Sequence, residues 1–162
     1  MDKWDARFME LAGVISGWAS CYMPDRKIGA VIVKNKRIVT TGYNGAPAGI
    51  KTCVERGECL REKLGIASGT RHEICYAVHA EQNAIMAAGR DRCIGATMYI
   101  YGFDRETGEL VAKPDSCQMC KRAIINSGIE TVCFALGKED IRTALVKDWI
   151  ANGDAEPNPD GY

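Results

Sequence analysis

Four side chains able to bind a metal or move a proton stand in two short motifs of this sequence. His79 precedes a run of small apolar residues typical of a helix, and Glu81 follows it two positions later. Cys117 and Cys120 form a C-x-x-C pair before a second such run. Two cysteines at this spacing lie one turn apart on one helix face. The positive end of the helix dipole also favours their thiolates, which prepares them to bind a metal.

One histidine and two cysteines provide three ligands for zinc and leave the fourth tetrahedral position for water. That arrangement marks a catalytic zinc site rather than a structural one. Zinc lowers the pKa of its bound water to about 7, which yields a nucleophile at neutral pH. Glu81 is close enough in sequence to reach that water without binding the metal, so we expect it to transfer the proton. Alone, each motif is ambiguous, because C-x-x-C also serves as a thioredoxin-like redox pair.

The predicted elements explain how the two motifs meet. Apolar periodicity, β-branched runs and turn residues predict helix and strand segments in alternation. The predicted helices cover about 2–20, 58–65, 80–89, 117–127 and 138–151, and the predicted strands cover 28–33, 37–42, 96–101 and 130–135. The first two strands form a hairpin around Lys34–Lys36, and 103–111 is a turn or hairpin excursion.

Strands that alternate with helices imply parallel crossovers, so the sequence predicts an α/β fold, a three-layer α/β/α sandwich with a mixed sheet. Helices that follow neighbouring strands of such a sheet begin at the same edge. His79, Cys117 and Cys120 are therefore expected to converge. We expect Asp115 or Ser116 to cap the helix that carries the cysteines.

Composition limits the classes of protein to consider. The 162 residues fit a single domain, and 21 basic residues balance 21 acidic ones. This balance disfavours a long nucleic acid as partner but allows a single nucleotide. The sequence has neither a secretory leader nor a run long enough for a membrane span, so we expect a cytoplasmic protein that binds no membrane. The polar tail from about 153 to 162 is expected to be mobile.

Eight cysteines in a reducing compartment indicate metal binding more than disulfides. Cys93 and Cys133 stand alone near apolar strands and are expected to be small buried hydrophobes. Between about 53 and 76 lies an irregular insert with few apolar residues. Its pattern C-x5-C…H-x-x-C predicts a second, structural zinc. The four expected ligands are Cys53, Cys59, His72 and Cys75. In the alternative interpretation two of these cysteines are simply buried and the histidine is exposed.

The motifs together resemble a known family. The run HAEQNAI (79–85) with the downstream CQMC (117–120) resembles the H-x-E…P-C-x-x-C pattern of the zinc nucleobase deaminases. The run IGAVIVKNKRIVTTGYNGAPAG (28–49) resembles the opening strands and loop of deoxycytidylate deaminases. The resemblance extends from about residue 5 to about residue 136. It implies a cytidine-deaminase-like sandwich that assembles as a homo-oligomer, a dimer or a hexamer.

The resemblance also implies an activity and roles for individual residues. The implied reaction is hydrolysis of the 4-amino group of dCMP to dUMP and ammonia, in pyrimidine deoxynucleotide metabolism. Glu81 would take the water proton, protonate N3 of the base and help the amine to leave. The implied substrate contacts are Asn44 and Ala80, with Arg26 and Lys27 near the 5′-phosphate. Because some relatives use a cysteine at the end of the first helix, Cys21 is an alternative ligand for the second zinc.

Two departures from the family pattern bear on the substrate. Ser116 stands where the family usually has proline, and an extra segment, 102–113, precedes the second motif beside the expected base pocket. A related deaminase acting on another base or nucleoside, such as cytidine, CMP or guanine, is the first alternative. A non-catalytic zinc-binding or thiol-redox module is the alternative from a different class. Such a module has no use for Glu81, which separates it from a deaminase.

Overall fold

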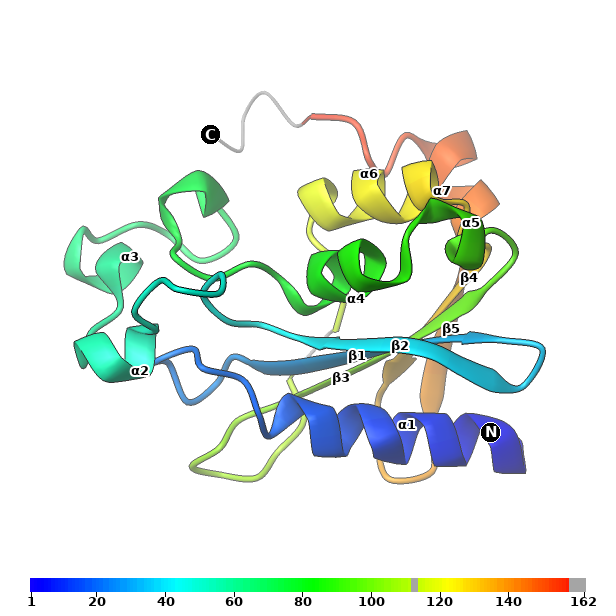
Figure 1. Ribbon diagram of the computed structural model, residues 1–162, viewed down its shortest axis with the longest axis horizontal. Helices are drawn as coiled ribbons and strands as arrows, with labels where there is room; N and C mark the ends of the chain where they lie inside the picture. Colours follow the sequence, from blue (N-terminus) through cyan, green and yellow to red (C-terminus); the bar gives the residue numbers. More distant parts are fainter. Residues whose placement is uncertain (112–113, 158–162) are drawn as a thin grey trace.

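The computed structural model describes residues 1–111 and 114–157, and within them the chain forms one five-stranded sheet (Figure 1). The strand order is β2-β1-β3-β4-β5. The strands are β1 (Lys27–Lys34), β2 (Arg37–Tyr43), β3 (Thr97–Phe103), β4 (Thr131–Ala135) and β5 (Ile141–Leu145). β3 and β4 are parallel, and the other neighbouring pairs are antiparallel. The predicted mixed sheet is confirmed.

Helices cover both faces of the sheet, which confirms the predicted three layers (Figure 1). One face is covered by α1 (Lys3–Ser16). The opposite face carries α4 (Ala80–Ala88), α5 (Arg90–Cys93), α6 (Gln118–Ser127) and α7 (Val146–Asn152). The topology therefore brings the starts of α4 and α6, and with them the two motifs, to one face of the sheet.

Two apolar clusters hold the layers together. On β1, Ala30 and Ile32 face α4 and α6, whereas Val31 and Val33 face α1, and all four are buried. A central strand covered on both faces needs such a continuous apolar run. Cys93 and Cys133 are buried in these clusters, as the sequence predicted.

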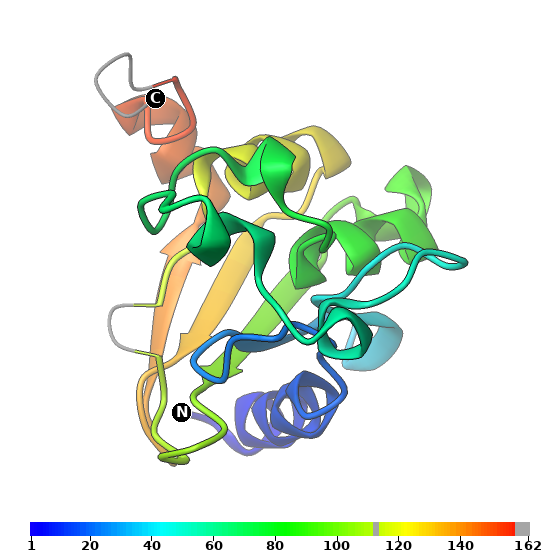
Figure 2. The ribbon, with the colours of Figure 1, turned by 90° about the vertical axis from the view of Figure 1, so that its left-hand side faces the viewer.

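The insert lies at one end of the sheet and has little regular structure. It contains α2 (Cys53–Arg56), α3 (Leu60–Lys63) and a 3₁₀ turn, η1 (His72–Ile74). Figure 2 shows this segment in front of the sheet end. No residue between 50 and 79 belongs to either apolar cluster. The insert is thus attached to the domain without sharing its core.

Three sequence predictions need comment. The helix expected over 138–151 is wrong in its first half, where β5 pairs antiparallel with β4. The segment forms a strand despite its helical periodicity, because β5 supplies hydrogen-bond partners for the edge of β4 that would otherwise be open. The 103–111 excursion is a hairpin turn, closed by a bridge between Phe103 and Leu110. The last two residues of the 102–113 segment and the last five of the expected tail lie outside the described residues.

None of the described helices is both long and apolar enough to cross a membrane.

Candidate active site

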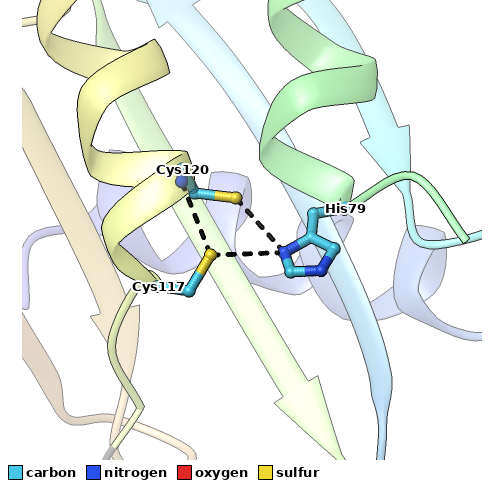
Figure 3. Close-up of side chains that lie close together, drawn as sticks. All are labelled: His79, Cys117 and Cys120. Carbon is cyan, nitrogen blue, oxygen red and sulfur yellow. Dashed lines mark hydrogen bonds between the residues drawn. The ribbon is translucent and has the colours of Figure 1, made fainter. Parts of the chain in front are cut away.

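Three metal-ligating side chains meet where α4 and α6 begin (Figure 3). His79 is the N-cap residue of α4, Cys117 is the N-cap residue of α6, and Cys120 lies in the first turn of α6. The Nδ1 atom of His79 is 3.5 Å from Cys117 Sγ and 3.3 Å from Cys120 Sγ. Among the described residues, these three alone form a group whose ligand atoms all lie within 4.8 Å of one another. The predicted convergence is confirmed.

The predicted capping of α6 is wrong. Neither Asp115 nor Ser116 caps the helix; the sulfur of Cys117 accepts the hydrogen bond of the Cys120 backbone N–H, at 3.4 Å. The Cys120 side chain, His79 and this N–H together lower the pKa of the Cys117 thiol. A thiolate is therefore favoured at this position before any metal binds. Two thiols and an imidazole around one point are the donor set that zinc prefers, so the residues fit the metal.

Glu81 lies beside this cluster but outside the ligand set. Its side chain is only 6% exposed, yet it lines a cavity of about 300 Å³ together with His79 and Cys117. The hydroxyl of Ser116 donates a hydrogen bond of 2.9 Å to Glu81 Oε1. A buried carboxylate in the wall of a cavity, next to metal ligands but not one of them, is placed to exchange protons with a bound molecule.

Three of the four expected substrate contacts lie in the same cavity wall. These are Arg26, Asn44 and Ala80. The amide of Asn44 ties the start of β1 to the end of β2, because its Oδ1 accepts from the N–H of Ile28 at 2.9 Å and its Nδ2 donates to the carbonyl of Arg26 at 2.6 Å. Arg26 itself is paired with Glu62 at 3.1 Å.

Lys27 is not brought together with these residues. It is 3% exposed and absent from the cavity wall, and its ammonium donates to the backbone carbonyls of Ala19 and Cys21. Burial lowers the pKa of Lys27, whereas the neighbouring thiols of Cys21 and Cys53 raise it. The ammonium therefore binds backbone carbonyls of the loop between α1 and β1, and the side chain does not line the cavity.

The residues expected at the second metal site all line the cavity. Their ligand atoms are not gathered into a group as compact as that of His79, Cys117 and Cys120. Cys53, Cys59, His72 and Cys75 line it, and so does Cys21. Burial raises the pKa of the Cys53 thiol, and the nearby thiols of Cys21, Cys75 and Cys59 raise it further. The ring of His72 lies edge-on to that of His79, with ring centroids 4.9 Å apart, and both its nitrogens are buried without a hydrogen-bond partner.

Sequence reasoning missed Arg61, a buried cation of the cavity wall. Arg61 is 6% exposed and donates to the carbonyl oxygens of Ala67 and Thr70 at 2.9 and 2.5 Å. It lies in a stretch of alternating charges, ECLREK (58–63), that is typical of an exposed helix. No signal in the sequence separates this arginine from its exposed neighbours.

The fold and the site together define a class. A mixed sheet between two helical layers, with a histidine and two cysteines at the starts of two helices and a buried glutamate beside them, is the arrangement of a zinc-dependent hydrolase that acts on a nucleobase. Comparison with known proteins agrees with this assignment. Residues 2–136 match the family model described as the cytidine and deoxycytidylate deaminase zinc-binding region. The chain therefore belongs to the cytidine and deoxycytidylate deaminase family.

Named relatives cover most of the chain. It is 35% identical over 136 residues to the deoxycytidylate deaminase of Mycobacterium phage D29, a match that spans 81% of this chain and 93% of that protein. It is 33% identical over 132 residues to the deoxycytidylate deaminase of Schizosaccharomyces pombe. That match spans 82% of this chain but 37% of the yeast protein, so the chain corresponds to about a third of this relative's length.

A solved structure shares the fold. The crystal structure of dCMP deaminase from the cyanophage S-TIM5 in apo form superimposes with a TM-score of 0.55 at 22% sequence identity. The superposition covers 83% of this chain and 84% of the phage chain. This likeness shows that the two chains share a fold.

Proposed function

We propose that the protein is a deoxycytidylate deaminase, which hydrolyses the 4-amino group of dCMP to give dUMP and ammonia. The observation that carries this proposal is the buried Glu81 in a cavity wall beside His79, Cys117 and Cys120. A redox pair or a structural zinc site has no need of an acid there. The relatives named deoxycytidylate deaminase, at 33% and 35% identity, support the choice of substrate.

In the proposed mechanism, one group of residues binds the metal and a separate residue transfers protons. His79, Cys117 and Cys120 would hold zinc, which when bound lowers the pKa of a coordinated water to about 7 and so supplies the nucleophile. Glu81 would accept a proton from the attacking water, deliver a proton to N3 of the base and then assist departure of the amine. Burial of Glu81 keeps bulk water away from the carboxylate during these transfers.

Three further residues of the cavity wall are proposed to recognise the nucleotide. We assign the 5′-phosphate to Arg26, the sugar or base to Asn44 and the base to the backbone of Ala80. Arg26→Ala is expected to raise KM for dCMP roughly tenfold or more, because a charged hydrogen bond is lost. KM for deoxycytidine, which has no phosphate, should stay unchanged. An equal rise for both substrates would remove the phosphate assignment.

Ammonia release across a panel of substrates tests the activity itself. The panel includes dCMP, CMP, cytidine, deoxycytidine and guanine. We expect the highest kcat/KM for dCMP. A preference for a substrate without phosphate would overturn the assignment to dCMP, and the absence of release from every substrate would overturn the assignment as a deaminase.

We also propose a second, structural zinc, and the structure supports a modified set of ligands. Cys21 lies close enough to Cys59 and Cys75 for their thiols to raise its pKa, in addition to the effect of burial. Lys27 and Arg61 are buried cations at this end of the molecule, and neither is paired with a carboxylate among the described residues. A zinc ion with four thiolates carries a net negative charge, which would account for both cations.

The favoured ligands are therefore Cys21, Cys53, Cys59 and Cys75, with His72 as the alternative to Cys21. Two matched variants separate these sets by zinc content. Cys21→Ser is expected to retain about one zinc per chain, because the catalytic site still binds its metal while the four-thiolate site does not. His72→Ala is expected to retain both ions. The reverse result would favour the histidine, and a wild-type protein with a single zinc would remove the second site altogether.

We further propose that the chain forms a homo-oligomer. Trp18 and Tyr43 are 62% and 39% exposed, and their rings meet edge-to-face with centroids 6.2 Å apart. Exposed aromatic pairs of this kind are enriched at protein interfaces. Sedimentation at several protein concentrations tests the proposal, and Trp18→Ser should shift the distribution toward the monomer.

A further inference from the structure

The turn that leads into α6 carries a buried hydroxyl directed at Glu81. Ser116 is 4% exposed, and its Oγ lies 2.9 Å from Glu81 Oε1. Glu81 lines the main cavity, whereas Ser116 does not; it lines a neighbouring hollow of about 480 Å³ together with Lys121. The hydroxyl thus approaches the carboxylate from outside the substrate cavity and is not a substrate contact.

Ion pairs hold this turn in place. Asp115 bonds Lys121 of α6 at 2.8 Å and Arg142 of β5 at 3.1 Å. The same arginine donates to the carbonyl of Pro114 at 2.6 Å. Residues on both sides of the turn therefore fix the segment 114–116, and the Ser116 side chain is presented to Glu81 by a restrained backbone.

When zinc is bound, the Ser116 hydroxyl is the side-chain donor that remains for the Glu81 carboxylate. Among the described residues, Ser116 alone forms a hydrogen bond to the Glu81 carboxylate that meets normal geometry. The thiol of Cys120 is also close to this carboxylate, but a thiol that binds zinc is deprotonated and has no hydrogen to donate. Serine thus holds one oxygen of a carboxylate that lines the cavity.

We propose that Ser116 is a positioning residue that fixes the orientation of the Glu81 carboxylate. The proposal rests on the deaminase function put forward above. The family pattern has proline at this position, and proline has no hydroxyl, so the contact is a property of this chain rather than of the pattern. Ser116 acts through Glu81, and removing its hydroxyl leaves the ligands and the cavity wall unchanged.

Ser116→Ala tests the proposal. We expect kcat for dCMP to fall about ten- to hundredfold, the size of effect that follows when a reacting group is misplaced by ~1 Å. KM should stay within twofold, and zinc affinity, measured by competition with a chelator, should equal that of the wild type. A crystal structure of the zinc-loaded variant should show the Glu81 carboxylate rotated or in several orientations.

A buried serine at the C-terminal end of α6 provides the matched control. Ser127 is also 4% exposed, and its hydroxyl donates to the carbonyl of Ile124 at 2.8 Å, far from the ligands along α6. Ser127→Ala should leave kcat, KM and zinc affinity unchanged. Ser116→Thr keeps the hydroxyl and should recover at least a third of wild-type kcat.

Several results would overturn the proposal. A Ser116→Ala variant with kcat within threefold of wild type, or one that loses zinc, contradicts a positioning role. So does a threonine variant that is fully loaded with zinc yet as slow as the alanine variant. If the wild type releases no ammonia from any substrate, the proposed function fails. The orientation of Glu81 in the alanine variant then still decides whether Ser116 holds it.

Discussion

At the scale of single residues, Glu81 lies next to the proposed metal ligands without belonging to their group, so we propose that it transfers protons rather than binds the metal. Glu81→Gln keeps the size and the hydrogen bond to Ser116 but removes the ability to carry a proton. We expect turnover of dCMP to fall about 10²–10⁴-fold, the usual contribution of a general acid–base group. Zinc content, measured by atomic absorption, should not change. Near wild-type turnover would contradict the assigned role.

Tyr99 offers a residue-scale test on the opposite face of the sheet. Its hydroxyl donates to Asp5 of α1 at 2.7 Å. Tyr99→Phe is expected to lower the free energy of unfolding by about 1–3 kcal/mol, because a partly buried hydrogen bond to a charged group is lost. Urea unfolding measures this change. Zinc content and turnover should stay at wild-type values, since α1 does not contribute to the catalytic cluster.

The same tyrosine predicts a dependence on pH. Burial and the contact with Asp5 raise the pKa of Tyr99 well above its ordinary value of 10.0. The folded state therefore favours the protonated phenol, so this contribution is complete below pH 10.0 and is lost as the pH rises above it. The stability difference between wild type and Tyr99→Phe should shrink above pH 10.0. A difference that grows there would contradict the sign.

Residue spacing and the order of strands and helices were sufficient to predict that His79, Cys117 and Cys120 come together. His79, Cys117 and Cys120 stand at helix starts, and helices after neighbouring strands begin at one edge, so their meeting follows from local pattern and topology. Lys27 and Ser116 were different, because each of their contacts involves a loop. Lys27 bonds carbonyls of the loop before β1, and Ser116 itself lies in the turn before α6. Lys27 turns toward Cys21 through the path of the chain between α1 and β1, and no periodicity encodes that path.

At the scale of elements, we expect the geometry of the His79, Cys117 and Cys120 cluster to depend on how closely α4 packs on the sheet. Gly42 of β2 faces α4, and a Cβ at this position would overlap the carbonyl of Ala80 and the N–H of Ala84. Gly42→Ala should displace α4 and lower stability by about 1–3 kcal/mol, as overpacking does. His79 and Glu81 move with α4, so zinc affinity and kcat should fall as well.

Gly29 of β1 is the matched control for Gly42. Its missing Cβ would overlap the carbonyl of Ala12 and the N–H of Ser16, so Gly29→Ala should displace α1 in the same way. A comparable loss of stability is expected in chemical unfolding, but the zinc affinity measured with a chelator should stay close to wild type. If both variants lost zinc equally, zinc binding would depend on overall stability rather than on the packing of α4 against the sheet.

Most of the long elements followed from the sequence, and the one segment assigned to the wrong type has a physical cause. The segment 141–145 was assigned to a helix by its amphipathic pattern, yet it pairs with β4 as an edge strand. Ile141 and Thr143 are β-branched and favour a strand, and Arg142 lies over the ring of Phe134 with its guanidinium carbon 4.3 Å from the ring centroid. Such a contact with a residue of another strand is invisible to a pattern read along one segment.

At the scale of the whole molecule, the domain combines a core that packs by itself with an insert that does not. Both apolar clusters are built from the sheet and the helices that flank it, and neither includes a residue between 50 and 79. The insert instead holds four of the five cysteine and histidine side chains considered for the second zinc. Metal binding there would supply ordering free energy that apolar burial does not provide.

Removal of zinc by a chelator should therefore unfold the molecule in part rather than as a whole. Hydrogen exchange of backbone amides in 53–75 should become fast, because local opening follows where few apolar contacts resist it. Amides of β1, β3 and β4 should remain protected, since their clusters contain no metal ligand. Readdition of zinc should restore protection of the insert. Exchange that accelerates across the entire sheet would mean that the metal supports the core as well, and an insert with unchanged protection would mean that it is ordered without the second ion.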